Sequence, residues 1–239
     1  MYRLTPRQVV VIISRSPADP KLSALARDIG PVRLDDLLLA TLRDAIAAAV
    51  RVDGVTIAAV APTRGHLVHL RQLLPAGVEF AAPPEPLGPG RLARFALTSF
   101  QGRDYERIML VDSAVLHLTS RLVGTGLGAL ASADAVVGGS QRGATYAFGL
   151  LERHVDRFAQ SEEPLIHGDR LATEFVGQLR AMRLGTRRLD PLPTLDAFSS
   201  LNDLESAVLG VPGSHHLSAF LTSLPLTQTA LGDLERHIR

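Results

Sequence analysis

Apolar runs of strand length alternate with amphipathic stretches through the first 150 residues of the chain. The run Gln8–Ile13 is almost entirely β-branched, which is typical of a strand that is covered on both faces. Val55–Val60 and 107–111 are similar runs, and in the stretch 34–50 leucine and alanine recur at helical spacing. This alternation predicts an α/β fold in which right-handed crossovers connect the strands of a mainly parallel sheet.

Shorter elements are expected between and after these runs. Further strands are expected at 77–80, 133–137 and 186–189, and a glycine-bearing return at 143–149 follows the second of these. Further helices are expected at 65–74, 91–101, 152–159, 169–182, 201–209 and 226–238. A helix of about four turns is expected directly after Ser113, with the glycines of 124–128 at its end. The stretch 81–90 is rich in proline and glycine and is expected to be a loop within the domain.

Length and composition narrow the class of protein. With 239 residues, of which 46% are hydrophobic, the chain can bury a substantial core, and its length suits one α/β domain better than two. The 25 basic residues nearly balance the 24 acidic ones, so no overall field attracts nucleic acid or an anionic membrane. A small-molecule or protein partner is expected instead. The absence of cysteine excludes disulfides and thiolate metal sites.

The sequence also carries no pattern of membrane insertion or secretion. No stretch approaches the ~20 apolar residues that span a bilayer. The first residues lack the apolar run and the small-residue cleavage site of a secretory signal. A cytoplasmic protein is therefore expected.

One acidic residue stands where open α/β sheets collect ligands. Asp112 follows the buried run 107–111, and the carboxyl ends of parallel strands meet the amino ends of helices at this edge of a sheet. Asp112 is therefore a candidate to contact a ligand or a metal ion. Alternatively, its carboxylate caps the turn between strand and helix by accepting backbone amides. The sequence leaves both interpretations open.

Two segments around this position resemble a known family. They are Tyr105-Glu-Arg-Ile-Met-Leu-Val-Asp-Ser113 and Ala133-Asp-Ala-Val-Val-Gly-Gly-Ser-Gln-Arg-Gly-Ala-Thr-Tyr-Ala-Phe-Gly-Leu150. They resemble the core of a GT-A-type transferase family, the bacterial proteins often labelled arsenosugar-biosynthesis-type glycosyltransferases. That family is related to the nucleotidyltransferases that make the guanylylated molybdenum cofactor. Its members carry Gly-Ser-Asp-Ser-Pro after a strand, and later Gly-Pro-x-x-Asp-Gly-Gly-Tyr-Tyr-x-x-Gly-Leu. Further likeness at 87–92 and 202–204 extends the resemblance over roughly the first 210 residues.

The resemblance implies a fold, a substrate class and a cofactor. The implied fold is GT-A, a nucleotide-diphospho-sugar transferase-like three-layer sandwich with a mainly parallel central sheet. It implies a single nucleotide-binding domain over 1–210, with 211–239 as a C-terminal extension. The implied substrate is a nucleotide or a nucleotide-activated sugar. The implied cofactor is Mg²⁺ or Mn²⁺, which carboxylates position against the diphosphate.

The resemblance also assigns residues to the two motifs. Asp112 matches the Asp of the first motif, the catalytic and metal-binding carboxylate, and Ser113 matches the Ser that follows it. The Asp of the second motif falls on Arg142, which precedes the retained Gly143. A cation cannot bind a metal ion, although an arginine can bind phosphate in a bidentate manner. Arg142 thus either substitutes for the charge of the metal or marks lost catalysis.

Three further candidates lie in other segments. The usual second metal-binding Asp of the family falls on Ser199, so Asp196, three residues earlier, is the candidate ligand if the loop is shifted. The alternative for Asp196 is a solvated loop acid. Arg15 matches a lysine of the family's phosphate-binding loop after the first strand, and Lys21 lies nearby. The alternative for both cations is an ordinary surface position.

The residues support three hypotheses about function. The leading one is a GT-A-like transferase for glycosyl or nucleotidyl transfer, with Asp112 at the metal or ribose end of the substrate. The second is a catalytically degenerate member, kept as a nucleotide-binding or scaffold subunit, in which the extension 211–239 contacts a second copy or a partner protein. The third is a metal-free nucleotide site in which Arg15, Lys21 and Arg142 supply the charge. It predicts binding that a chelator leaves unchanged and that Arg142→Ala weakens.

Overall fold

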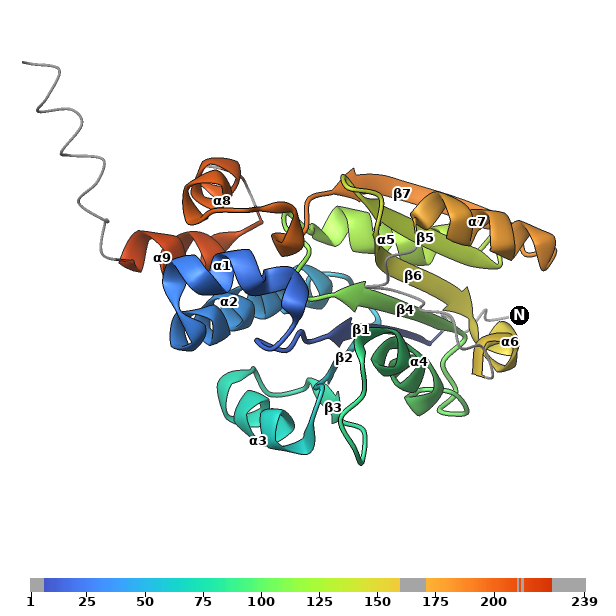
Figure 1. The fold of residues 1–239 in the computed structure, drawn as a ribbon. Coiled ribbons are helices and arrows are strands. Elements are labelled where there is room, and N and C mark those ends of the chain that lie inside the picture. The colour runs from blue at the N-terminus through green and yellow to red at the C-terminus, as the bar shows by residue number, and fades with distance from the viewer. Residues whose placement is uncertain (1–6, 160–170, 210, 212, 225–239) are drawn as a thin grey trace, which may run out of the picture.

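A seven-stranded sheet forms the centre of the computed structural model, which describes residues 7–159, 171–209, 211 and 213–224 (Figure 1). The strand order is β3-β2-β1-β4-β6-β5-β7. The strands are β1 (Gln8–Ile13), β2 (Val55–Val60), β3 (Glu79–Ala81), β4 (Arg107–Asp112), β5 (Ala135–Ser140), β6 (Thr145–Leu151) and β7 (Thr186–Leu192). Strand β6 runs antiparallel to β4 and β5, and the other pairings are parallel. The sheet is therefore mainly parallel, as predicted.

Helices cover both faces of this sheet. Successive side chains of a strand point to opposite faces, so in β1 Val9, Val11 and Ile13 join one apolar cluster while Val10 and Ile12 join another. The first cluster includes residues of α4 (Pro89–Ser99), α6 (Asp156–Ala159) and α7 (Ala172–Ala181). The second includes residues of α2 (Pro31–Val50), α3 (Arg64–Leu73) and α5 (Ser120–Ala129). The described chain is a three-layer α/β sandwich, which confirms the predicted fold class.

A third apolar cluster lies at the end of the sheet to which β4 points (Figure 1). It combines Ala114 and Leu116, just after β4, with Leu195, just after β7. Helices that contribute to it are α1 (Ser23–Ile29), α2, α8 (Leu201–Val208) and α9 (His215–Ser223). Short 3₁₀ turns are η1 (Pro20–Leu22), η2 (Glu152–His154) and η3 (Leu195–Ala197). This cluster joins the carboxyl edge of the sheet to the last described helices.

Helix α9 was not predicted from the sequence. Its first turn is held by Asp44 of α2, whose two carboxylate oxygens accept the backbone N–H groups of His216 (2.9 Å) and Leu217 (3.0 Å). Leu217 and Leu221 are buried against the third cluster. A side chain from 172 residues earlier therefore does the work of an N-cap.

The chain directly after β4 differs from the prediction. A helix was expected after Ser113, but α5 begins only at Ser120, where Thr119 caps it by accepting the N–H of Leu122. The intervening backbone pairs elsewhere. Leu116 N–H donates to the carbonyl of Pro193, and Leu195 N–H donates to the carbonyl of Ala114. We call this pairing of 114–116 with 193–195 the clasp. It replaces helical hydrogen bonds with bonds to a segment about 80 residues away, and a local pattern cannot reveal such a partner.

The glycines of 124–128 lie in the C-terminal part of α5, which ends at Ala129, so the prediction that they stand at the end of this helix is confirmed. Gly126 has a packing reason for lacking a side chain, because a Cβ there would lie 3.0 Å from Cε of Met109. The helix therefore approaches β4 closely at this point. The predicted helix 226–238 lies outside the described residues. Within the described part of the chain, no helix combines the length and the apolar character needed to cross a membrane.

Candidate functional site

Asp112 ends β4 at the carboxyl edge of the sheet and is only 1% exposed. Its Oδ1 accepts the backbone N–H of Ala114 at 2.8 Å, so the carboxylate does cap the turn after the strand. It also accepts the side chain of Arg15 side-on, with Nε 3.2 Å from both carboxylate oxygens and Nη2 2.6 Å from Oδ2. Both oxygens of Asp112 are therefore engaged within the protein.

Arg15 follows β1, the strand next to β4, and its side chain is 4% exposed. The register of the sheet sets Ile13 opposite Asp112, so the chain that follows β1 passes directly over the end of β4. Arg15 N–H donates to Oγ of the buried Ser113 at 3.2 Å. Backbone and side chain of Arg15 are thus both tied to the end of β4.

Two further carboxylates face the same guanidinium. Asp19 Oδ2 lies 3.3 Å from Nη1 of Arg15, and Asp196 Oδ2 lies 3.7 Å from Nη2. We call Arg15 with Asp19, Asp112 and Asp196 the carboxylate cage. Its formal charges leave two negative charges in excess. Oδ1 of Asp196 is buried and accepts no hydrogen bond from the described residues.

Burial alone would lower the pKa of Arg15, because a buried guanidinium loses its hydration. The attraction and hydrogen bonds of Asp112, with smaller contributions from Asp196 and Asp19, outweigh burial and raise that pKa above its ordinary value. The guanidinium therefore stays charged, and its five N–H groups keep their preference for carboxylate oxygens.

The fold class raises the question of a divalent cation held by Asp112 and Asp196. Oxygen ligands suit Mg²⁺ and Mn²⁺, and the two carboxylates do lie at one place. However, the guanidinium of Arg15 contacts both of them, and among the described residues no three His, Cys, Asp or Glu side chains are arranged to hold a metal ion. While Arg15 stays in place, the cage does not fit a metal ion shared by these two carboxylates.

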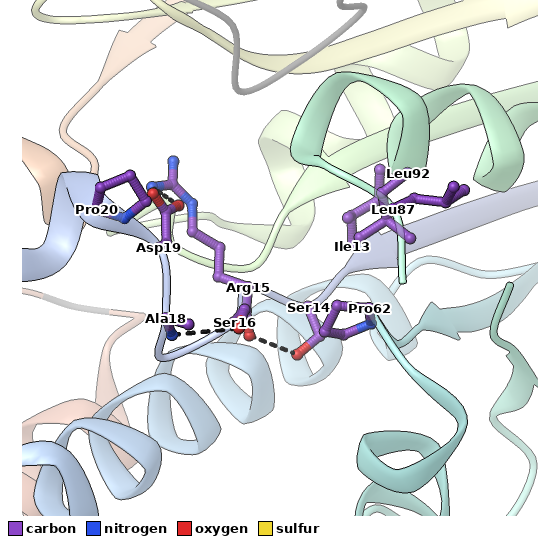
Figure 2. A pocket seen from close by; sticks show the side chains of 10 residues that line it. All are labelled: Ile13, Ser14, Arg15, Ser16, Ala18, Asp19, Pro20, Pro62, Leu87 and Leu92. Atoms are coloured by element: carbon purple, nitrogen blue, oxygen red, sulfur yellow. Dashed lines mark hydrogen bonds and ion pairs between the residues drawn. The ribbon is translucent and has the colours of Figure 1, made fainter. Parts of the chain in front are cut away.

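An apolar pocket of about 150 Å³ opens beside the cage. Its wall is built from the end of β1 and the loop that follows it, the chain just after β2, and the segment that leads into α4 with the first turn of that helix. Lining residues include Ser14, Arg15, Ala18, Pro62, Leu87 and Leu92. Figure 2 shows the guanidinium beside Asp19 and Pro20, on the far side of the pocket from Leu87 and Leu92. The volume is below the ~300 Å³ at which small-molecule sites typically begin, so the pocket can enclose a part of a ligand such as a planar base.

The other predicted site residues lie around this edge. Lys21 is exposed in η1, and its N–H donates to Oδ1 of Asp19 at 3.0 Å. Arg142 is exposed between β5 and β6, and its Nη1 donates to the carbonyl of Asp196 at 3.2 Å. Gly143 adopts φ +94°, and a Cβ there would meet Leu171 at 2.8 Å, so its conformation and packing explain this glycine.

The structure thus brings together Arg15, Asp112, Ser113 and Asp196 directly, with Arg142 reaching the backbone of Asp196. Sequence reasoning missed Asp19. Two signals point to it, because it precedes Pro20 at the start of a helical turn and stands four residues after Arg15. The clasp explains how Asp196 reaches the cage, since it places the start of η3 against the chain that follows Asp112.

No protein-family model and no curated protein matches the chain. Solved structures do. A protein described as a nucleotide-diphospho-sugar transferase from Desulfovibrio desulfuricans G20 superposes with a TM-score of 0.71 at 19% identity, over 91% of this chain and 98% of the other. 4-Diphosphocytidyl-2C-methyl-D-erythritol synthase from Anaerococcus prevotii gives 0.55 at 10% identity, over 91% and 96%. Rv0371c of Mycobacterium tuberculosis, solved as a manganese complex, gives 0.53 at 13% identity, over 81% and 94%.

These likenesses define the class of the fold. The chain has a nucleotide-diphospho-sugar transferase-like fold, which structures of cytidylyltransferase type share. At identities of 10–19% the likeness concerns the fold alone. The residues of the site have to be interpreted from their own geometry.

Proposed function

We propose that this chain binds a nucleotide or a nucleotide-activated sugar at the carboxyl edge of its sheet, as a transferase of the nucleotidyl or glycosyl type. The observation that carries the proposal is the apolar pocket over β1 and β2, which opens beside a cluster of charged side chains. Ligands of open α/β sheets bind at this edge. Pro62, Leu87 and Leu92 offer the apolar walls that a base requires.

The proposed substrate places its base in the pocket and its phosphates outside it. The donors of Arg15 are engaged by carboxylates, so the phosphates lie nearer the exposed cations Lys21 and Arg142. In nucleotidyl transfer, an acceptor phosphate oxygen forms a bond to the α-phosphorus as the bond to the pyrophosphate leaving group breaks. In glycosyl transfer, an acceptor hydroxyl displaces the nucleoside diphosphate from the anomeric carbon. On this proposal, the chain is also a relative of the arsenosugar-type glycosyltransferases and of the molybdenum-cofactor guanylyltransferases.

The test is ligand-induced stabilisation by a panel of CTP, GTP, UTP, ATP and sugar nucleotides. A ligand at about 100 times its Kd stabilises the native state by about 2.7 kcal/mol, which raises the Tm of a chain of this length by roughly 5–10 °C. Ala18→Trp places a bulky ring at the exposed rim of the pocket and is expected to abolish the shift. Ala76→Trp, an exposed position outside the pocket, is the matched control and should retain it.

A binding nucleotide then serves in an assay of turnover with phosphorylated and hydroxylated sugar acceptors. Release of pyrophosphate identifies nucleotidyl transfer, and release of a nucleoside diphosphate identifies glycosyl transfer. Absence of stabilisation by every nucleotide, or full stabilisation of Ala18→Trp, would contradict the proposal.

A second candidate is a nucleotide-binding protein without catalysis. The observation in its favour is the carboxylate cage itself, because Asp112 is buried and engaged by Arg15 instead of facing the pocket. In this case, nucleotide stabilisation is expected without any turnover. As part of the same proposal, residues 1–210 form the nucleotide-binding domain, and 211–239 form an extension available to a partner or a second copy.

A further inference from the structure

We propose that Arg15 is a built-in cation that occupies the place of a divalent ion between Asp112 and Asp196, so that ligand binding at this edge proceeds without metal. The identity of the ligand rests on the proposed function. The ion-binding part stands on the geometry of the cage and is testable without a nucleotide.

Three separate segments bring carboxylates to one point. Asp19 comes from the loop after β1, Asp112 from the end of β4, and Asp196 from η3 after β7. Each has an oxygen within 4 Å of the guanidinium of Arg15, at 3.3, 2.6 and 3.7 Å. Convergence of acids from distant segments is the arrangement that hard cations require, and here the centre holds a guanidinium.

The guanidinium is fixed in this position. Nε and Nη2 bind the carboxylate of Asp112 side-on, the geometry in which an arginine pairs most strongly with a carboxylate. Nη1 donates to Asp19, which in turn accepts the N–H of Lys21 and so is held by the first turn of η1. A divalent ion in contact with both Asp112 and Asp196 would have to displace a buried, charged and hydrogen-bonded side chain.

The charge of the cage indicates what its carboxylates would bind without Arg15. Three carboxylates around a single positive charge leave two negative charges in excess, and removal of Arg15 leaves three acids close together in a site of low exposure. Uncompensated buried charges destabilise the native state strongly. A divalent ion offers two charges to these oxygens, although the described acids would have to move closer to it, since in their present positions they are not arranged to hold a metal ion.

One oxygen of the cage has no partner among the described residues. Oδ1 of Asp196 is buried, while the side chain as a whole is 15% exposed. Its carboxylate therefore contributes to the negative excess of the cage from a largely covered position. The excess negative charge of the cage repels phosphate, so phosphate groups are left to the exposed cations outside it.

The experiment measures binding of Mn²⁺ alone, by titration calorimetry and by the electron paramagnetic resonance signal of the unbound ion. Wild-type protein is expected to show no specific Mn²⁺ site. Arg15→Gln removes the charge and keeps much of the length of the side chain. It is expected to bind Mn²⁺ roughly tenfold or more tighter than the nonspecific sites of the wild-type protein do, and to gain thermal stability from the ion. Arg43→Ala is the matched control, since Arg43 bonds the carbonyl of Leu73 away from the cage, and it should gain no site.

The double variant Arg15→Gln/Asp112→Asn identifies the ligands, because it should lose the Mn²⁺ binding that Arg15→Gln gains. If Arg15→Gln fails to fold, it is refolded with and without Mn²⁺, and recovery only with the ion supports the proposal while no recovery contradicts it. A stoichiometric Mn²⁺ site in the wild-type protein would overturn it outright. Nucleotide stabilisation that EDTA abolishes would also overturn it. If no nucleotide binds but Arg15→Gln gains Mn²⁺ binding, the proposed function is contradicted while the proposal that Arg15 replaces a divalent ion is supported.

Discussion

At the scale of single residues, the pair of Arg15 and Asp112 decides both the stability and the chemistry of the site. Each side chain is nearly inaccessible, so the loss of either one removes the shortest ion-pair contact of a buried charge. Exposed ion pairs contribute little because water solvates the separated charges well. A buried pair contributes to stability mainly through the cost of breaking it.

Asp112→Asn tests this dependence. The amide cannot carry the charge that faces Arg15, so we expect a loss of about 3 kcal/mol in the free energy of unfolding, at the lower end for a broken buried pair because Asp19 and Asp196 remain. Asp104→Asn is the matched control, because Asp104 pairs with Arg7 at the exposed surface. Urea denaturation measures both, and equal effects of the two variants would contradict the buried-pair argument.

The sequence predicted the place of these residues but not their pairing. The run before Asp112 identified the end of a buried strand, and the neighbouring position of β1 is expected for this fold. Whether a carboxylate there faces a ligand or an arginine depends on the path of the loop 14–19. That path is set by tertiary contacts such as Arg15 N–H to Ser113, which no local pattern encodes.

At the scale of elements, one glycine and one tyrosine determine how β5 and β6 pack against each other and against β7. A Cβ at Gly138 would lie 2.5 Å from the ring of Tyr146. That ring is buried, and its hydroxyl donates to the carbonyl of Asp190 in β7 at 2.8 Å. The tyrosine therefore lies across β5 and ties β6 to β7, and the missing side chain of Gly138 makes room for it.

Two glycine-to-alanine changes should shift the free energy of unfolding in opposite directions. Gly138→Ala forces the ring of Tyr146 to move and is expected to destabilise the protein by about 1–3 kcal/mol. Gly124→Ala lies in α5 with open space around its position and is expected to stabilise the protein by about 0.5–1 kcal/mol through helix propensity. Thermal or urea unfolding of the two variants provides the measurement. A stabilised Gly138→Ala would show that the ring has room to shift.

Elements whose conformation follows from their own residues were predicted with the correct bounds. Strands β1 and β2 have the expected bounds because β-branched runs covered on both faces have no other good conformation. The stretch 113–119 and helix α9 were missed for a common reason. Their backbone groups are satisfied by partners distant in sequence, Pro193 for the first and Asp44 for the second.

At the scale of the whole molecule, Asp44 joins the middle of α2 to the last described helix. Burial raises the pKa of Asp44 above its ordinary value, and the amide hydrogen bonds of His216 and Leu217 only partly oppose this. The native state therefore holds the proton of Asp44 at a higher pH than the unfolded chain does. Its protonation contributes stability at low pH, and this contribution is lost as the pH rises through the raised pKa.

Comparison with Asp44→Asn, which cannot titrate there, isolates this effect. The stability of the wild-type protein relative to the variant should increase as the pH falls from neutral towards about 4, by less than about 1.4 kcal/mol per pH unit. Asp36→Asn removes an exposed carboxylate from the same helix and controls for the lost charge. Urea unfolding across this pH range is the measurement. A relative stability that decreases on acidification would contradict the assigned direction of the pKa shift.

The clasp restricts how a guest molecule can reach this edge of the sheet. The segment that follows Asp112 is hydrogen-bonded to the segment that precedes Asp196. These two acids therefore cannot move apart in a hinge motion without breaking backbone hydrogen bonds. A ligand can instead enter the pocket past Ala18 and Leu87, which line it from loops and not from paired backbone. A molecule too large for this opening would bind only through a narrow terminal group that fits into the pocket.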